Sequence, residues 1–225
     1  MYFTLLVFFV LRHPEGARNY THMQAARRVF RMRSSRRPSI PQDIHELAGI
    51  LNNPQYPNYS RTFQTPPSTF FQEEIFVNGM SVGLVFANRD AIAKYQPELN
   101  TATLVGVDGT FKTVPSYPPD LDCLFTFQVL FKNVVSNCSH CQYSGHIVTF
   151  YFLFQAFPMV YVLLGSKTEE TYCAVLTIIR QILPLNYDRI RFITDYEKGL
   201  MNAVTRIFPT SRLQCCWFHY TQVIF

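Results

Sequence analysis

The chain has 225 residues, of which 48% are hydrophobic and 16% are charged. This composition is too apolar for a disordered protein, and the length allows one or two packed domains. The net charge of +5 is unevenly distributed, because residues 1–40 contain eight arginines and a single acid, Glu15. Residues 1–40 therefore predict a basic, poorly ordered segment in front of a nearly neutral body.

A basic arm of this kind is typical of proteins that grip a phosphate backbone, since lysine and arginine displace the counterions of DNA. A solvated arm without a partner is an equally weighted interpretation. The candidate nucleic-acid-binding residues are Arg27, Arg28, Arg31, Arg33, Arg36 and Arg37.

Six cysteines, two of them adjacent, do not resemble a secreted disulfide framework, and they favour a reducing intracellular compartment. The apolar stretch at residues 1–12 is about half the length that a membrane span requires. It also lacks the positive start and the small-residue cleavage site of a signal peptide. We therefore expect no membrane association. The alternative is a secreted or membrane-anchored protein led by this stretch.

In chain order, residues 43–51 (DIHELAGIL) predict a short helix, and a hairpin follows Phe70 with Asn78-Gly79 as its turn. A second short helix is expected at about residues 89–95. Together these elements predict a small α+β region at residues 41–100.

The remaining residues, 101–225, predict alternating strands and helices. Strands are expected at 104–108, 123–131 and 157–165. A helix follows, with Ser166 and Glu169 as a capping box, and then a strand at 189–195, a helix at 197–209 and a strand at 213–219. Three strands in succession, followed by strand–helix units, indicate an α/β fold. The expected architecture is an RNase H-like mixed sheet: a three-strand meander followed by parallel strand–helix units, incomplete at the C-terminus.

Two aspartates stand at strand ends in this pattern. Asp108 follows one apolar strand and Asp195 ends another. If these strands are neighbours, the two carboxylates converge, and converging carboxylates are suitable ligands for Mg²⁺. Spacing alone favours the simpler interpretation, because aspartates at strand ends are ordinary loop-starting residues.

Four motifs alter this balance: VDGTFKTVP (107–115), AFPMVYVLLGSKTEETY (156–172), TDYEKGL (194–200) and CWFHYTQ (216–222). Together they resemble the Mutator-like element (MULE) transposase domain, over about residues 104–225. The resemblance implies that Asp108 and Asp195 are catalytic and are the first two members of a metal-binding DDE triad. It also implies Mg²⁺ or Mn²⁺ as cofactor, DNA as partner, a nuclear location and a homo-oligomer in a full-length form. The third acid of the triad would lie further downstream, and Glu197 is interpreted as a first-turn helix residue.

The resemblance also includes a C-x-x-H pair, which corresponds here to Cys216 and His219. These residues are possible Zn²⁺ ligands, and a buried cysteine beside a structural histidine is an equally weighted interpretation. Residues 132–155 form an atypical insertion, which we interpret as a retained intron. Its Cys138, His140, Cys141 and His146 match no common zinc finger spacing.

The preferred function is therefore a fragment of a MULE-type DNA transposase. Loss of one carboxylate from a two-metal site removes much of the charge that stabilises the transition state, so we expect this chain alone to be inactive. The alternative is a domesticated, non-catalytic DNA- or chromatin-binding protein.

Overall fold

The computed structural model describes residues 22–34, 37–111, 113–131 and 155–216. The chain divides into two compact units, Met1–Ser39 and Ile40–Phe225. In the first unit the described structure is a single helix, α3 (His22–Ser34). None of the helices in the described ranges is long and apolar enough to cross a membrane.

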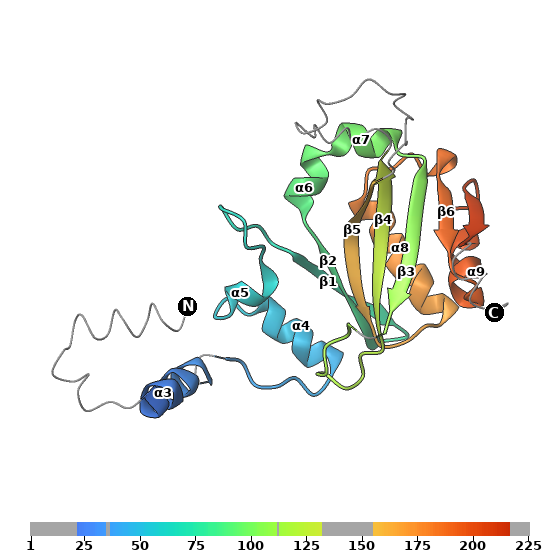
Figure 1. Ribbon diagram of the computed structural model, residues 1–225. Helices are drawn as coiled ribbons and strands as arrows, with labels where there is room; N and C mark the ends of the chain where they lie inside the picture. The colour runs from blue at the N-terminus through green and yellow to red at the C-terminus, as the bar shows by residue number, and fades with distance from the viewer. Residues whose placement is uncertain (1–21, 35–36, 112, 132–154, 217–225) are drawn as a thin grey trace, which may run out of the picture. The chain divides into compact units, whose positions relative to one another are not determined.

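The second unit is built on a seven-stranded mixed sheet with the strand order β1-β2-β5-β4-β3-β6-β7 (Figure 1). Its central strands β3, β4 and β5 form an antiparallel meander, β6 runs parallel to β3, and β7 runs parallel to β6. This is the predicted meander followed by parallel strands. The strands are β1 (Phe71–Val77), β2 (Met80–Ala87), β3 (Leu104–Thr110), β4 (Cys123–Phe131), β5 (Gln155–Leu164), β6 (Arg191–Thr194) and β7 (Arg212–Cys215). Strands β1 and β2 come from residues 41–100 and join the same sheet through β2 and β5.

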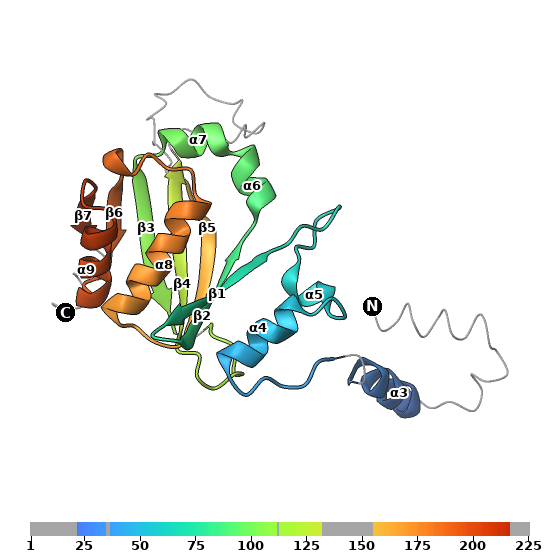
Figure 2. The same cartoon turned by 180° about the vertical axis from the view of Figure 1, so that it is seen from behind.

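One face of the sheet is covered by α8 (Glu169–Ile182) and α9 (Lys198–Ile207), as Figure 2 shows. Alternate residues of β3, β4 and β5 point under these helices, in accord with the two-residue period of a strand. Phe127 and Phe192 are fully buried there, with ring centroids 6.1 Å apart. Phe192 also stacks on Phe208 at 4.9 Å. These contacts make up much of the main hydrophobic core.

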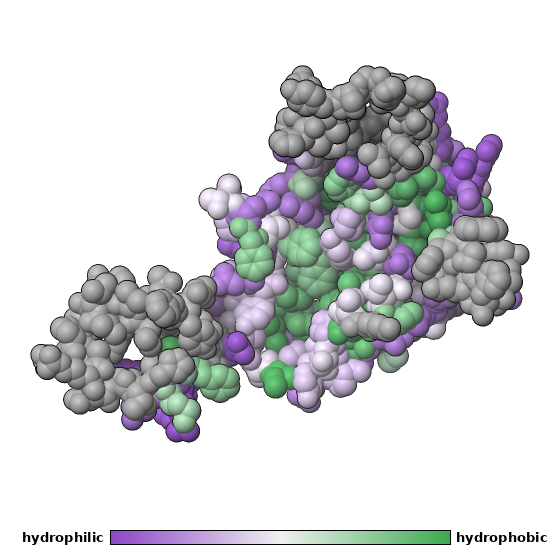
Figure 3. Space-filling model, viewed as in Figure 1, coloured by the Kyte–Doolittle hydropathy of each residue, from purple (hydrophilic) through white to green (hydrophobic). Residues whose placement is uncertain are grey.

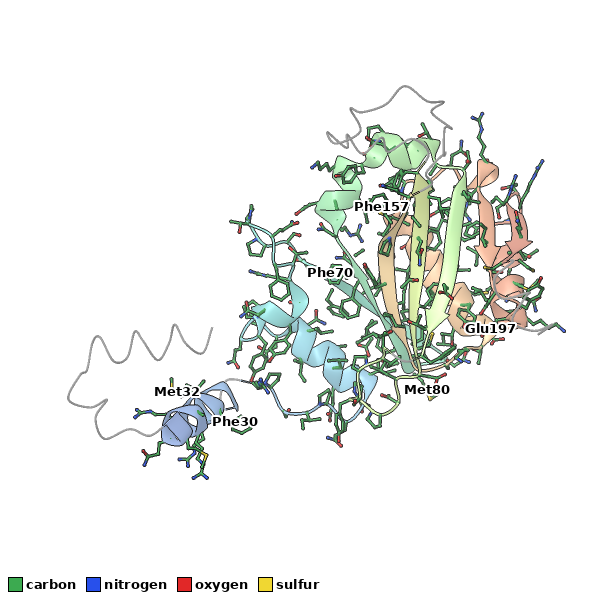
Figure 4. The ribbon with its side chains drawn as sticks, viewed as in Figure 1. Phe30, Met32, Phe70, Met80, Phe157 and Glu197 are labelled. Atoms are coloured by element: carbon green, nitrogen blue, oxygen red, sulfur yellow. The ribbon has the colours of Figure 1, made fainter. Side chains whose placement is uncertain are left out.

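The opposite face is only partly covered. Helix α4 (Ile44–Asn52) packs against the β1–β2 end through Ile44, Ala48 and Leu51. Beyond it lies an apolar groove of about 490 Å³ that includes Phe70 and Tyr161. Figure 3 shows hydrophobic residues gathered in this hollow, and Figure 4 labels Phe70 and Phe157 on the same side. We call this side the open face.

Short helices complete the second unit. They are α5 (Pro57–Ser60), α6 (Arg89–Lys94), α7 (Gln96–Thr101) and a 3₁₀ turn η1 (Tyr187–Arg189). The predicted hairpin turn is confirmed, because Asn78 and Gly79 have φ angles of 52° and 79°. Two consecutive positive φ values are the requirement of the type I′ turn that matches the twist of a hairpin.

The predicted capping box at Ser166 is wrong. The N-cap of α8 is Thr168, whose side chain accepts a hydrogen bond from the Thr171 N–H at 3.2 Å. Ser166 instead bonds the Thr171 hydroxyl, with 2.7 Å between the two oxygens. Serine and threonine are both good N-cap residues. The helix starts at Thr168 because the hydroxyl of this residue reaches the backbone N–H of Thr171.

Replacement of Phe127 by alanine should lower the free energy of unfolding by about 3–5 kcal/mol, because it leaves a cavity in a fully buried site. Chemical denaturation measures this change. The control is Phe63→Ala, at a side chain that is 98% exposed, where we expect a change within about 0.5 kcal/mol. Equal effects of the two substitutions would contradict the assigned core.

Candidate functional site

The parallel pairing of β3 with β6 determines where the two candidate aspartates lie. Leu104 is level with Arg191, and Gly106 is level with Ile193. Two residues further along, this register brings Asp108 level with Asp195. Both residues are half-buried, at the end of the sheet toward which β3 and β6 run. The structure thus brings together the two acids that the sequence singled out.

The glycine after Asp108 has a packing role. A Cβ atom at Gly109 would lie 2.9 Å from the Sγ atom of Cys123 on the neighbouring strand. Real Cβ atoms do not approach other atoms so closely, and glycine is therefore suited to the position that follows the acid. Burial raises the pKa of the Cys123 thiol to about 11, so this thiol is neutral and is a poor metal ligand.

Glu197 is a third acid at this end of the sheet, and it has a more specific environment than the sequence indicated (Figure 4). The Tyr172 hydroxyl donates to Glu197 Oε1 at 2.9 Å, and the Glu197 N–H donates to Asp195 Oδ1 at 3.2 Å. Glu197 is the N-cap residue of α9, yet its side chain makes no capping bond. Its carboxylate is therefore held by a tyrosine of the neighbouring helix.

The pKa of Glu197 is raised, first by burial and then by the negative charge of Asp195. The hydrogen bond from Tyr172 and the charge of Lys167 act in the opposite direction. Lys167 lies 3.5 Å from Asp122 Oδ2, and its Nζ stands 3.8 Å from the centroid of the Phe111 ring. The positive charge of Lys167 therefore lies close to the acidic end of the sheet.

The described residues hold no group of three or more histidine, cysteine, aspartate or glutamate side chains arranged to bind a metal. Asp108 and Asp195 still provide hard oxygen donors of the kind that Mg²⁺ accepts while it keeps several waters. The donor set therefore fits a magnesium-like ion with two protein carboxylates.

The possible zinc pair is only partly visible. Cys216 follows β7, and its N–H donates to the Thr194 carbonyl at 2.7 Å. Its expected partner His219 lies outside the described residues, as do Cys138, His140, Cys141, His146 and the rest of the predicted insertion up to residue 154. The four cysteines in the described ranges are all free thiols.

The arginines of the first unit are placed on α3 and just after it. Arg27, Arg28 and Arg31 are exposed on the helix, and Arg37 is exposed beyond it. Arg36 and the side chain of Arg33 lie outside the described structure. Arg27, Arg31 and Arg37 thus carry positive charge at the surface.

The sequence alone does not identify Glu197 and Tyr172 as a pair. They are 25 residues apart and meet only because α8 and α9 pack side by side on the sheet. The TDYE motif was the available signal, since it places an acid two residues after Asp195.

Comparison with known families finds that residues 137–223 match the model of the MULE transposase domain. The match covers less than half of the chain. It includes Asp195, Glu197, Cys216 and His219, and it begins after Asp108. A search of curated proteins finds no match. The family match supports a MULE transposase domain in this chain.

Replacement of Tyr172 by phenylalanine should raise the pKa of Glu197 further, because it removes a hydrogen bond that favours the charged carboxylate. Carboxyl carbon shifts followed by NMR through a pH titration measure this pKa. Tyr187→Phe is the matched control, since the Tyr187 hydroxyl bonds backbone carbonyls of α8 and its C-terminus instead. An unchanged or lower pKa in Tyr172→Phe would contradict the proposed contact.

Proposed function

We propose that this chain, in view of its MULE transposase domain, is a DNA-binding protein of the transposase class whose Asp108 and Asp195 hold a divalent metal ion. The observation that carries the proposal is the register of β3 and β6, which brings these two carboxylates level at one end of the sheet. We also infer that the core is RNase H-like. The strand order β5-β4-β3-β6-β7, with an antiparallel meander and two parallel strands, supports this inference.

A bound Mg²⁺ or Mn²⁺ would polarise a phosphoryl oxygen and lower the pKa of a coordinated water. The protein holds the metal ligands in position before the metal binds. The β-ladder fixes the backbone at Asp108, and the bond from the Glu197 N–H orients Asp195. Tyr172 holds Oε1 of Glu197, and no described residue donates to Oε2. Glu197 is thus positioned beside Asp195.

DNA is the expected partner, and the exposed arginines of α3 would contact its phosphates. A nuclear location follows as part of the same proposal. The second candidate function is a DNA- or chromatin-binding protein without catalysis. The exposed arginines of α3 support it, because phosphate contacts need no metal.

Wild-type protein should bind Mn²⁺, and Asp108→Asn or Asp195→Asn should each weaken binding by about tenfold or more, because each removes one of two charged ligands. Isothermal titration calorimetry measures the affinity. Asp90→Asn is the control, since Asp90 is an exposed acid at the start of α6. Equal affinity of Asp108→Asn and Asp90→Asn would disprove the metal site.

For the 225-residue polypeptide itself, we expect metal binding without DNA strand cleavage. Only Asp108 and Asp195 in it match acids of the triad that the resemblance implies, and two-metal chemistry needs further ligands for the second ion. A supercoiled plasmid incubated with Mg²⁺ or Mn²⁺ reports nicking. Nicking that Asp108→Asn abolishes would refute this expectation and would favour Glu197 as the missing ligand.

A further inference from the structure

A positively charged cavity lies at the other end of the sheet. It has a volume of about 420 Å³ and lies where β3, β6 and β7 begin. Arg189, Arg191 and Arg212 line it, together with one acid, Asp188. Asp188 accepts a hydrogen bond from the Thr210 hydroxyl. The cavity therefore has more positive than negative charge.

Two of the arginines are direct neighbours. Arg191 and Arg212 are register partners on the parallel strands β6 and β7. Both are exposed, and neither forms an ion pair with an acidic side chain of the described residues. Like charges opposite each other on adjacent strands are destabilising. An anion between the two guanidinium groups would remove this repulsion, and guanidinium groups bind phosphate through paired hydrogen bonds.

Strands β3 and β6 run from the cavity to the acidic end of the sheet. Leu104, which is level with Arg191, lines the cavity, and Asp108 lies four residues further along β3. Residues four apart on a strand face the same side, at about 13 Å from each other. Both places therefore lie within reach of one DNA strand that runs along β3.

We propose that Arg189, Arg191 and Arg212 form a phosphate-binding site for the DNA backbone, separate from the carboxylate site. This site would hold the same strand whose phosphate lies at Asp108 and Asp195. Phosphate contacts fix the position of DNA without reading its sequence. The site depends on the proposed DNA partner and is independent of the metal.

The test is the salt dependence of duplex DNA binding by the full chain in EDTA, measured by fluorescence anisotropy. Each phosphate contact contributes about 0.9 to the slope of log affinity against log salt. Arg191→Gln/Arg212→Gln should reduce that slope by about two and weaken binding equally for unrelated duplexes. Arg61→Gln/Lys94→Gln, which removes two exposed charges elsewhere, should leave the slope unchanged.

Arg191→Lys/Arg212→Lys separates charge from geometry. This variant should have the same slope of log affinity against log salt as the wild type, because the charge is kept. Its affinity for DNA should be lower, because the lysine ammonium group lacks the planar pair of N–H donors of a guanidinium group. Equal slopes for the wild type and the glutamine variant would overturn the proposal, even if inorganic phosphate binds at the cavity. An equal loss of slope in the control Arg61→Gln/Lys94→Gln would also overturn the proposal. EDTA keeps this result separate from the metal test, so either proposal can fail alone.

Discussion

The pairing of β3 with β6 depends on the burial of Val105, Val107 and Phe192 beneath the helices. Strand side chains alternate between faces, so the burial of these residues fixes the register as well as the contact. A slip of one residue would expose Phe192 and move Asp108 away from the level of Asp195. The same hydrophobic contacts that stabilise the fold therefore also place the acids, and mutations in the core should disturb the site at a distance.

The two ends of these strands have opposite electrostatic character. Asp108, Asp195 and Glu197 gather where β3 and β6 end, and Arg189, Arg191 and Arg212 gather where they begin. A phosphate backbone is attracted to the arginines and repelled by the acids unless a cation lies between them. The arrangement would thus make close approach of DNA to the acidic end dependent on metal, while the arginines retain the strand.

Much of this fold follows from local sequence patterns. The segment CLFTFQVLF is predicted as a strand with the bounds that β4 has, and the Asn78-Gly79 turn and both major helices were also predictable. The choice of Thr168 over Ser166 as the cap was not, because both offer a hydroxyl and only the backbone path decides. The Tyr172–Glu197 bond and the Arg191–Arg212 pair join residues that are more than twenty positions apart. Such pairs require the three-dimensional register, and no periodicity within one element encodes them.

The function proposed for this protein requires Asp108 and Asp195 to share a divalent metal ion. A crystal structure of the chain grown with Mn²⁺, with the metal located by its anomalous scattering, would show whether they do. We expect a peak between the two carboxylates, at the roughly 2.1 Å distance of a magnesium-like ion to oxygen, and no such peak in Asp108→Asn. An ordered structure with manganese only at other acids, or with none, would contradict it.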